Sequence, residues 1–378
     1  MKTVYLDNAS TTAIRPEVIS EITQLLAETY GNPSSTHSFG RSAKSVIENS
    51  RKKIASLLNA EAREIIFTSG GTEADNWIIR SAVRDLQVKR IITAKTEHHA
   101  VLHSVNAVAR EYGIRVDYIN LLPGGQPDPA HLKELLEEDI ATLVSLMHIN
   151  NETGVVTDLS VIGTICKEYK AWFHSDTVQS IGKEKLNLTE LPVDFIAASA
   201  HKFHGPKGIG FAFIRKNSGL KPILYGGEQE KGMRAGTEGV HQIAGMAKAL
   251  EVSLSNLETE KRHIAGLRNY LLQQLQETFP GFKLNGSTGN ETGLFYTIAN
   301  IMLPLPEEKT AMLLFTLDMN GIAVSRGSAC QSGSVKPSHV LQEILEEEDV
   351  KKPSLRISLS HYNTKEDIDA LLAALKKI

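Results

Sequence analysis

The chain has 378 residues, of which 41% are hydrophobic and 22% are charged, and its formal net charge is −3. This length exceeds the size at which a single hydrophobic core usually stops growing, so we expect two domains. The nearly neutral charge gives no electrostatic footprint for phosphate backbones or anionic lipid, which argues against direct nucleic-acid and membrane partners. No stretch approaches the roughly 20 continuous apolar residues that span a bilayer.

The two cysteines, Cys166 and Cys330, lie far apart in the sequence and do not form a disulfide framework. The first ten residues also lack the apolar core of a signal peptide. We therefore expect a reducing, cytoplasmic compartment.

Short apolar runs alternate with amphipathic stretches from about residue 64 to 215, which predicts alternating strands and helices. In chain order we expect strands within 64–71, 90–99, 114–120, 141–151, 171–180 and 194–208, and helices within 73–86, 100–113, 128–140 and 158–170. This order is typical of an α/β fold with a mostly parallel sheet covered by helices on both faces.

The periodic stretch 239–276 predicts one long helix leaving this first domain, with Gly245 as its weakest internal position. After it we expect strand 294–303, helix 307–320, strands 321–325 and 355–360, and helix 364–378, which together indicate a smaller α+β domain. The expected division is a large domain over 16–255 and a small one over 256–378 together with 1–15.

Polar residues follow five of the predicted strands: Thr72, His98, Asn151, Asp176 and Lys202. In parallel sheets ligands bind beyond the carboxyl ends of the strands, so we expect these residues to converge on one site.

Lys202 ends a run of small residues and lies between His201 and His204. A lysine in desolvating surroundings can lose its proton and form a Schiff base with an aldehyde, the usual attachment of pyridoxal phosphate. A lysine capping a surface turn fits the motif equally well, so the motif alone leaves both interpretations open.

The segment "FTSGGTEADN" predicts a helix start with Thr72 as N-cap and Asp75 as its capping-box partner. The backbone of Gly70 and Gly71 with the Thr72 hydroxyl could cradle a phosphate, although a plain capped helix fits too. The Walker and dinucleotide patterns are absent. Asp176 suits a pyridine nitrogen, or else serves as an N-cap.

His98, His99 and His103 include two residues four apart, but the zinc-protease pattern requires glutamate where Ala100 stands, so we favour an aromatic or acid–base role over metal. Cys330 lies among glycines, serines and other small residues in 324–339, whereas a structural cysteine usually has apolar surroundings, so the placement predicts a reactive thiol. Arg326 is a candidate for lowering the pKa of that thiol.

Eight segments in this order resemble the cysteine desulfurases, in the class V branch of the fold-type I pyridoxal phosphate enzymes: "YLDNASTT", "FTSGGTEADN", "TEHHAVLH", "MHINNETGVV", "HSDTVQSIGK", "SAHKFHGPKGIG", "RAGTE" and "GSACQSGSVKPSHVL". The likeness runs over nearly the whole chain. The long cysteine-bearing segment is similar to that of the group I enzymes.

The resemblance implies roles for individual residues. Lys202 corresponds to the Schiff-base lysine, His98 to the ring-stacking and proton-handling histidine, and Cys330 to the nucleophile. Further implied cofactor contacts are Asp176 at the pyridinium nitrogen, Gln179 at the ring oxygen, and Gly71, Thr72, Ser199 and His201 at the phosphate, with Thr237 reaching the phosphate of the other subunit of a homodimer. Asn151 and Arg356 are implied to hold the substrate carboxylate.

The implied activity removes sulfur from L-cysteine, gives L-alanine, and leaves a Cys330 persulfide for an acceptor protein, such as an iron–sulfur scaffold. Selenocysteine lyase, cysteine sulfinate desulfinase, a transaminase and a non-catalytic pyridoxal phosphate scaffold are the alternatives, because a fold does not fix a function.

Overall fold

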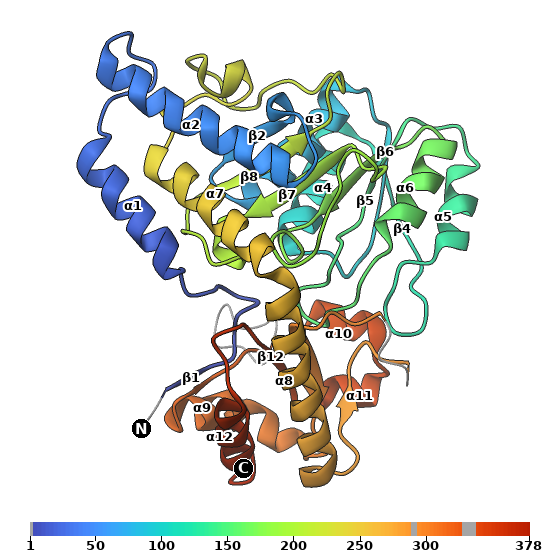
Figure 1. Ribbon diagram of the computed structural model, residues 1–378. Coiled ribbons are helices and arrows are strands. Elements are labelled where there is room, and N and C mark those ends of the chain that lie inside the picture. Colours follow the sequence, from blue (N-terminus) through green and yellow to red (C-terminus); the bar gives the residue numbers. More distant parts are fainter. Residues whose placement is uncertain (1–2, 289–292, 327–337) are drawn as a thin grey trace.

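The structure is a computed structural model, and it describes residues 3–288, 293–326 and 338–378. Cys330 and the glycines and serines around it lie outside the described residues. Figure 1 shows a larger part built around a sheet, a smaller part below it, and both chain termini in the smaller part.

The larger part contains a seven-stranded sheet with the order β2-β8-β7-β6-β5-β3-β4. Its strands are β2 (Ile65–Thr68), β3 (Arg90–Thr93), β4 (Arg115–Tyr118), β5 (Thr142–Ser145), β6 (Trp172–Asp176), β7 (Phe195–Ser199) and β8 (Gly210–Ile214). Strand β8 runs antiparallel to both of its neighbours, and the other neighbouring strands run parallel. The predicted mostly parallel sheet is therefore confirmed.

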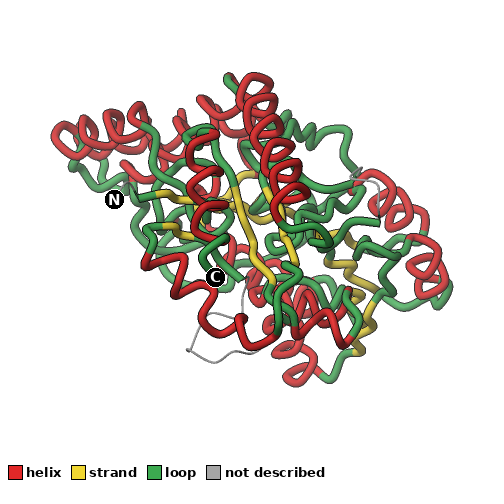
Figure 2. Tube along the Cα trace, turned by 90° about the horizontal axis from the view of Figure 1, so that it is seen from below, coloured by secondary structure: helices red, strands yellow, loops and turns green. Residues whose placement is uncertain are grey.

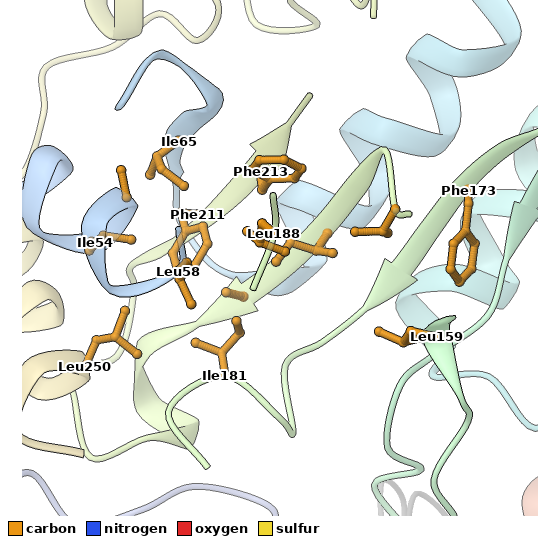
Figure 3. Close-up of a cluster of buried hydrophobic side chains, with 14 of the residues drawn as sticks. Ile54, Leu58, Ile65, Leu159, Phe173, Ile181, Leu188, Phe211, Phe213 and Leu250 are labelled. Carbon is orange, nitrogen blue, oxygen red and sulfur yellow. The ribbon is translucent and has the colours of Figure 1, made fainter. Parts of the chain in front are cut away.

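Helices cover both faces of this sheet, as Figure 2 shows. They are α1 (Pro16–Glu28), α2 (Ser38–Leu57), α3 (Gly71–Asp85), α4 (His99–Tyr112), α5 (Pro129–Leu136), α6 (Leu159–Glu168) and α7 (Val240–Ser255). Side chains alternate between the faces: Ile65 and Phe67 belong to the core under α2 and α7, whereas Ile66 belongs to the core under α3 and α4. Figure 3 shows part of the first core, with Ile54, Leu58 and Phe211.

The single helix predicted over 239–276 is wrong. Helix α7 ends at Ser255, and α8 (Leu257–Thr278) begins after Asn256, whose ψ of 2° is not helical. Gly245 serves packing: a Cβ there would lie 2.6 Å from Cδ1 of Ile22 on α1. The two helices lead from the larger part into the smaller one (Figure 1).

The smaller part has its own hydrophobic core, which joins the chain start to the C-terminal third through Val4, Leu6, Leu267, Ile301 and Leu355. Its strands are β1 (Val4–Tyr5), β9 (Lys283–Leu284), β10 (Ile298–Met302), β11 (Ile322–Ala323) and β12 (Ser354–Ser358). Its further helices are α9 (Thr310–Met319), α10 (His339–Ile344), α11 (Glu347–Lys351) and α12 (Lys365–Leu375). Strand β10 pairs with β9 and β12, and β1 pairs with β11.

Short 3-10 helices cover Ala62–Glu64, Ala200–Lys202, Gln229–Gly232 and Glu307–Lys309. The domain boundaries expected from the sequence stay a prediction. Among the described residues, no helix combines the length and the apolar character needed to cross a bilayer.

Candidate active site

A cavity of about 430 Å³ opens where the parallel strands end, between the sheet, residues 9–10 and strand β12. Most of the predicted site residues line it: Gly71, Thr72, His98, Asn151, Asp176, Gln179, Ser199, His201, Lys202 and Arg356. The five strand ends that the sequence analysis singled out thus meet at one place, because parallel strands direct their carboxyl ends to the same edge.

Lys202 follows β7 at the end of a short 3-10 helix. Its Nζ donates to the main-chain oxygens of Ala9 at 2.7 Å and Ser10 at 2.8 Å, inside the cavity. Burial and, to a smaller extent, the positive charge of Arg356 lower the pKa of Lys202 to about 8. Lys202 is therefore not a lysine capping a surface turn.

The start of α3 differs from the prediction. The N-cap is Gly70, so Thr72 is the second helical residue and does not cap, and Asp75 is buried rather than part of a capping box. Gly71 and Thr72 of the first turn still line the cavity, and the leading N–H groups of a helix have no partner within it. A Cβ on Gly71 would lie 2.6 Å from Cγ2 of Val178, so only glycine fits without displacement.

His98 is the N-cap of α4, and its Nδ1 accepts from the backbone N–H of Ala100 at 3.1 Å. The neutral imidazole therefore carries its proton on Nε2. Burial lowers the pKa of His98, which favours this neutral form. His99 stacks between His103 and His339, and the described ranges contain no cluster of histidine, cysteine and acidic side chains that would hold a metal.

Asp176 and Gln179 lie at the end of β6. Asp176 accepts from the backbone N–H of Val178 at 2.9 Å, and burial raises the pKa of its carboxyl while His98 lowers it. Gln179 donates from Nε2 to the oxygen of Ala9 at 2.9 Å, which leaves its second N–H for a ligand.

Ser199 and His201 bracket the end of β7. Nδ1 of His201 lies 3.1 Å from the hydroxyl of Thr11, and burial lowers the pKa of His201 to about 4. His201 is therefore neutral near pH 7 and offers an anion a hydrogen bond rather than a full charge.

Arg356 comes from β12 in the smaller part and is nearly completely buried. Its Nη1 donates to the main-chain oxygen of Asn151 at 2.9 Å, and its Nη2 donates to Asp7 Oδ1 at 2.8 Å and Ser10 Oγ at 2.6 Å. Its Nε is buried without a partner among the described residues. A guanidinium held in this way is preset for a carboxylate.

Two predicted residues are not among those that line the cavity. Thr237 is exposed outside it, and Cys330 lies beyond the described residues. Arg326 donates from Nη1 to the oxygen of Thr310, so its predicted effect on Cys330 stays a hypothesis.

The sequence analysis missed Asp7 and Ser10, which orient Arg356, and the site role of Asp75, whose carboxylate lines the cavity. His174 Nε2 lies 3.3 Å from Asp75 Oδ1, and burial raises the pKa of Asp75. The polar run "LDNAS" after the first short strand was the available signal, but nothing in the spacing links it to residue 356.

Comparisons with known proteins agree with this geometry. Residues 4–371 match the family described as aminotransferase class-V. A curated relative, cysteine desulfurase IscS of Dictyoglomus turgidum, is 41% identical over 99% of this chain and 94% of its own length. Cysteine desulfurase IscS of Methanosarcina thermophila is 40% identical over 100% of this chain and 92% of its own.

The chain belongs to the cysteine desulfurases of the class-V aminotransferase family. A solved NifS-like protein from Rickettsia africae has the same fold, with a TM-score of 0.88, 34% identity, and coverage of 100% of this chain and 99% of that one. The fold-type I architecture expected from the sequence is thereby confirmed.

Cysteine desulfurases depend on pyridoxal phosphate, and the cavity fits this cofactor. It offers the amine of Lys202, the first turn of α3, whose leading N–H groups have no partner within the helix, and a carboxamide with one N–H to spare. Oδ2 of Asp75 is buried without a hydrogen-bond partner among the described residues, whereas Oδ1 lies 3.3 Å from His174 Nε2.

Proposed function

We propose that this site removes sulfur from L-cysteine, releases L-alanine, and leaves the sulfur on Cys330 as a persulfide. The observation that carries the proposal is the buried Lys202 amine, which shares one cavity with His98 and the preset guanidinium of Arg356. The alternative activities are those of a selenocysteine lyase, a cysteine sulfinate desulfinase or a transaminase, and the test below distinguishes them from desulfuration.

Pyridoxal phosphate, when bound, supplies an aldehyde that holds an amino group and a pyridinium ring that withdraws electrons. Lys202 would be the attachment point, His98 would stack on the ring, and Asp176 would keep the ring nitrogen protonated. The proposed phosphate ligands are Gly71, Thr72, Ser199 and His201, joined by Thr237 of a second copy.

Substrate recognition is assigned to Asn151 and Arg356. The Arg356 guanidinium is already fixed by three oxygens, so the carboxylate meets a rigid donor rather than a mobile side chain. This contact selects amino acids over simple amines.

Proton transfer is assigned to Lys202 and His98. Because the pKa of Lys202 is about 8, part of the amine is neutral near pH 7 and takes the proton from the substrate Cα. His98 donates its proton from Nε2, because its Nδ1 already accepts a hydrogen bond from the backbone N–H of Ala100.

Sulfur transfer is assigned to Cys330. Its thiolate attacks the substrate sulfur, an S–S bond forms as the C–S bond breaks, and the electron pair returns to carbon, which gains a proton and leaves as alanine. The persulfide passes to an acceptor protein, for which an iron–sulfur scaffold is the proposed partner. A reducing compartment suits this chemistry.

The protein is also proposed to act as a homodimer. Tyr30 precedes α2 and Phe39 lies on it, and these side chains are 74% and 53% exposed. Their ring centroids lie 5.4 Å apart in a stacked arrangement, so the two residues form an apolar surface patch. A second copy covering this patch agrees with the placement of Thr237 outside the cavity of its own chain.

The test is alanine formation from L-cysteine by the protein loaded with pyridoxal phosphate, in the presence of a thiol reductant. We expect catalytic turnover in the wild type and none in Lys202→Ala or Cys330→Ala. Cys166→Ala is the matched control, because burial holds the pKa of Cys166 far above the ordinary thiol range and excludes it from reaction.

Retained turnover in Cys330→Ala would favour selenocysteine or sulfinate chemistry, with those substrates tested next. Absence of pyridoxal phosphate binding in the wild type would overturn the proposal altogether.

A further inference from the structure

Lys183 lies beneath the cavity, four residues after Gln179 in the turn that follows β6. Its Nζ donates to Gln179 Oε1 at 3.1 Å. Gln179 Nε2 in turn donates to the oxygen of Ala9, the same oxygen that accepts from Lys202 Nζ. A continuous chain of hydrogen bonds therefore links Lys183 to the lysine of the active site.

These contacts fix the direction of the Gln179 carboxamide. A carbonyl such as that of Ala9 only accepts, so it requires the NH2 end of the amide. The Lys183 amine donates, so it requires the oxygen end. Both contacts demand one orientation, in which the remaining N–H of Gln179 is available to a ligand in the cavity.

The backbone holds Lys183 in this place. Gly182 has a φ of +76°, and a Cβ there would lie 2.7 Å from the Cβ of Phe203, so the turn needs glycine to fold back under the site. The hydroxyl of Tyr296 donates to the main-chain oxygen of Lys183 at 2.8 Å. The residue is thus held at its amine and at its backbone.

The surroundings of Lys183 are unlike those of a surface lysine. It lines a small cavity, and burial, together with the charges of Lys202 and Arg356, lowers its pKa to about 7. The nearby Glu184 pairs with Lys261 at 2.8 Å. The exposed Lys185, two residues further on, pairs with Glu258 and is 73% exposed. Burying an amine costs free energy, which indicates that Lys183 has a function at this position.

We propose that Lys183 is a positioning residue, which sets the Gln179 carboxamide so that its free N–H meets the ring oxygen of bound pyridoxal phosphate. This inference rests on the proposed role of Gln179 at the cofactor. Lys183 is not among the residues that line the main cavity, so it acts through Gln179.

The first test compares Lys183→Met with the wild type and with Lys185→Met, which removes an equal charge from the surface. We expect the Kd for pyridoxal phosphate to rise about tenfold in Lys183→Met, the size of one hydrogen bond. The visible absorption band of the bound cofactor should also shift. Lys185→Met should match the wild type in both measurements.

A double-mutant cycle then separates positioning from simple packing. In a Gln179→Leu background, Lys183→Met should change neither the Kd nor the absorption band any further. Additive effects would overturn the inference, because Lys183 would then act independently of Gln179.

A second variant keeps the test valid if Lys183→Met fails to fold. Tyr296→Phe releases the backbone of Lys183 and should shift the absorption band in the same direction by a smaller amount. If the wild type binds pyridoxal phosphate and both Lys183→Met and Tyr296→Phe keep its Kd and absorption band, this inference alone is overturned. If the wild type does not bind pyridoxal phosphate, the proposed function is overturned as well.

Discussion

Lys202 and Arg356 show how single side chains obtain their chemistry from their surroundings. Burial and the neighbouring charge of Arg356 lower the pKa of Lys202, because an amine can lose its proton whereas a guanidinium cannot. The amine therefore becomes available as a nucleophile and base, while Arg356 stays a fixed positive charge.

This difference predicts the pH dependence of cofactor uptake. The neutral amine attacks an aldehyde, and the neutral fraction of Lys202 grows as pH rises through its pKa of about 8. The rate at which apoprotein takes up pyridoxal phosphate, followed by absorbance between about pH 6.5 and 9.5, should therefore rise and level off above that pKa. A flat or falling profile would contradict the assignment, and Lys202→Ala should show no such uptake.

Arg356→Lys tests the preset guanidinium. A lysine amine cannot bond the oxygens of Asn151, Asp7 and Ser10 and a substrate carboxylate together. We expect the KM for L-cysteine to rise by roughly 10- to 100-fold, equivalent to about 1.5–3 kcal/mol for a hydrogen bond to a charged group, with a smaller change in kcat. Steady-state kinetics checks this, with Arg262→Lys on the exposed face of α8 as control. An unchanged KM would remove Arg356 from substrate binding.

At the scale of elements, the site is built where strands end and one helix begins. In the first turn of α3, Gly71 lets the backbone pack closely against Val178, because a Cβ there would lie 2.6 Å from Cγ2 of Val178. Glycine at the exposed position 266 of α8 has no such neighbour: a Cβ there would meet nothing within 4 Å. The same residue type therefore serves binding in one helix and only weakens the other.

A pair of alanine substitutions should separate these two cases. Gly71→Ala should raise the Kd for pyridoxal phosphate at least about tenfold, because the new methyl group displaces Val178 beside Asp176 and Gln179. Gly266→Ala should leave the Kd unchanged and stabilise the fold by about 0.5–1 kcal/mol through lower backbone entropy in the unfolded chain. Titration with pyridoxal phosphate measures the Kd, and thermal unfolding measures the stability. Equal Kd values for Gly71→Ala and the wild type would contradict a phosphate site at Gly71.

At the scale of the whole molecule, the cavity needs both parts of the chain. Lys202 comes from the sheet, Arg356 comes from β12, and residues 9–10 lie between them and bond to both. If Thr237 contacts the phosphate bound by the other subunit, as proposed, a second copy of the chain completes each site.

Hybrid dimers test that possibility. Lys202→Ala and Thr237→Ala each damage a different part of the site, so neither homodimer should make alanine at the wild-type rate. If Thr237 serves the neighbouring subunit, a hybrid of the two variants contains one intact site. An equal mixture after subunit exchange should then regain about one quarter of wild-type activity, since half of the dimers are hybrids. No gain over the separate variants would place Thr237 in its own subunit or outside the site.

Local pattern was sufficient for much of this protein. The alternation of buried runs and amphipathic stretches determined the parallel sheet and its covering helices, because period 2 and period 3.6 are properties of the backbone itself. Strand ends could be located in the same way, and so could the residues that follow them, such as His98 and Lys202. Breaks of a single residue were not predictable: Asn256 interrupts the helix at a position where the apolar periodicity continues.

Contacts between residues far apart in the sequence were decided only by the tertiary structure. Nothing in the sequence links Asp7 and Ser10 to Arg356, or Lys183 to the orientation of Gln179, because hydrogen-bond partners depend on direction and distance in space rather than on spacing along the chain. Likewise, the pKa of Lys202 depends on how deeply it is buried and on which charges surround it. The sequence by itself predicted which residues carry the chemistry, and the folded packing decided which of them share one cavity and how each of them is held.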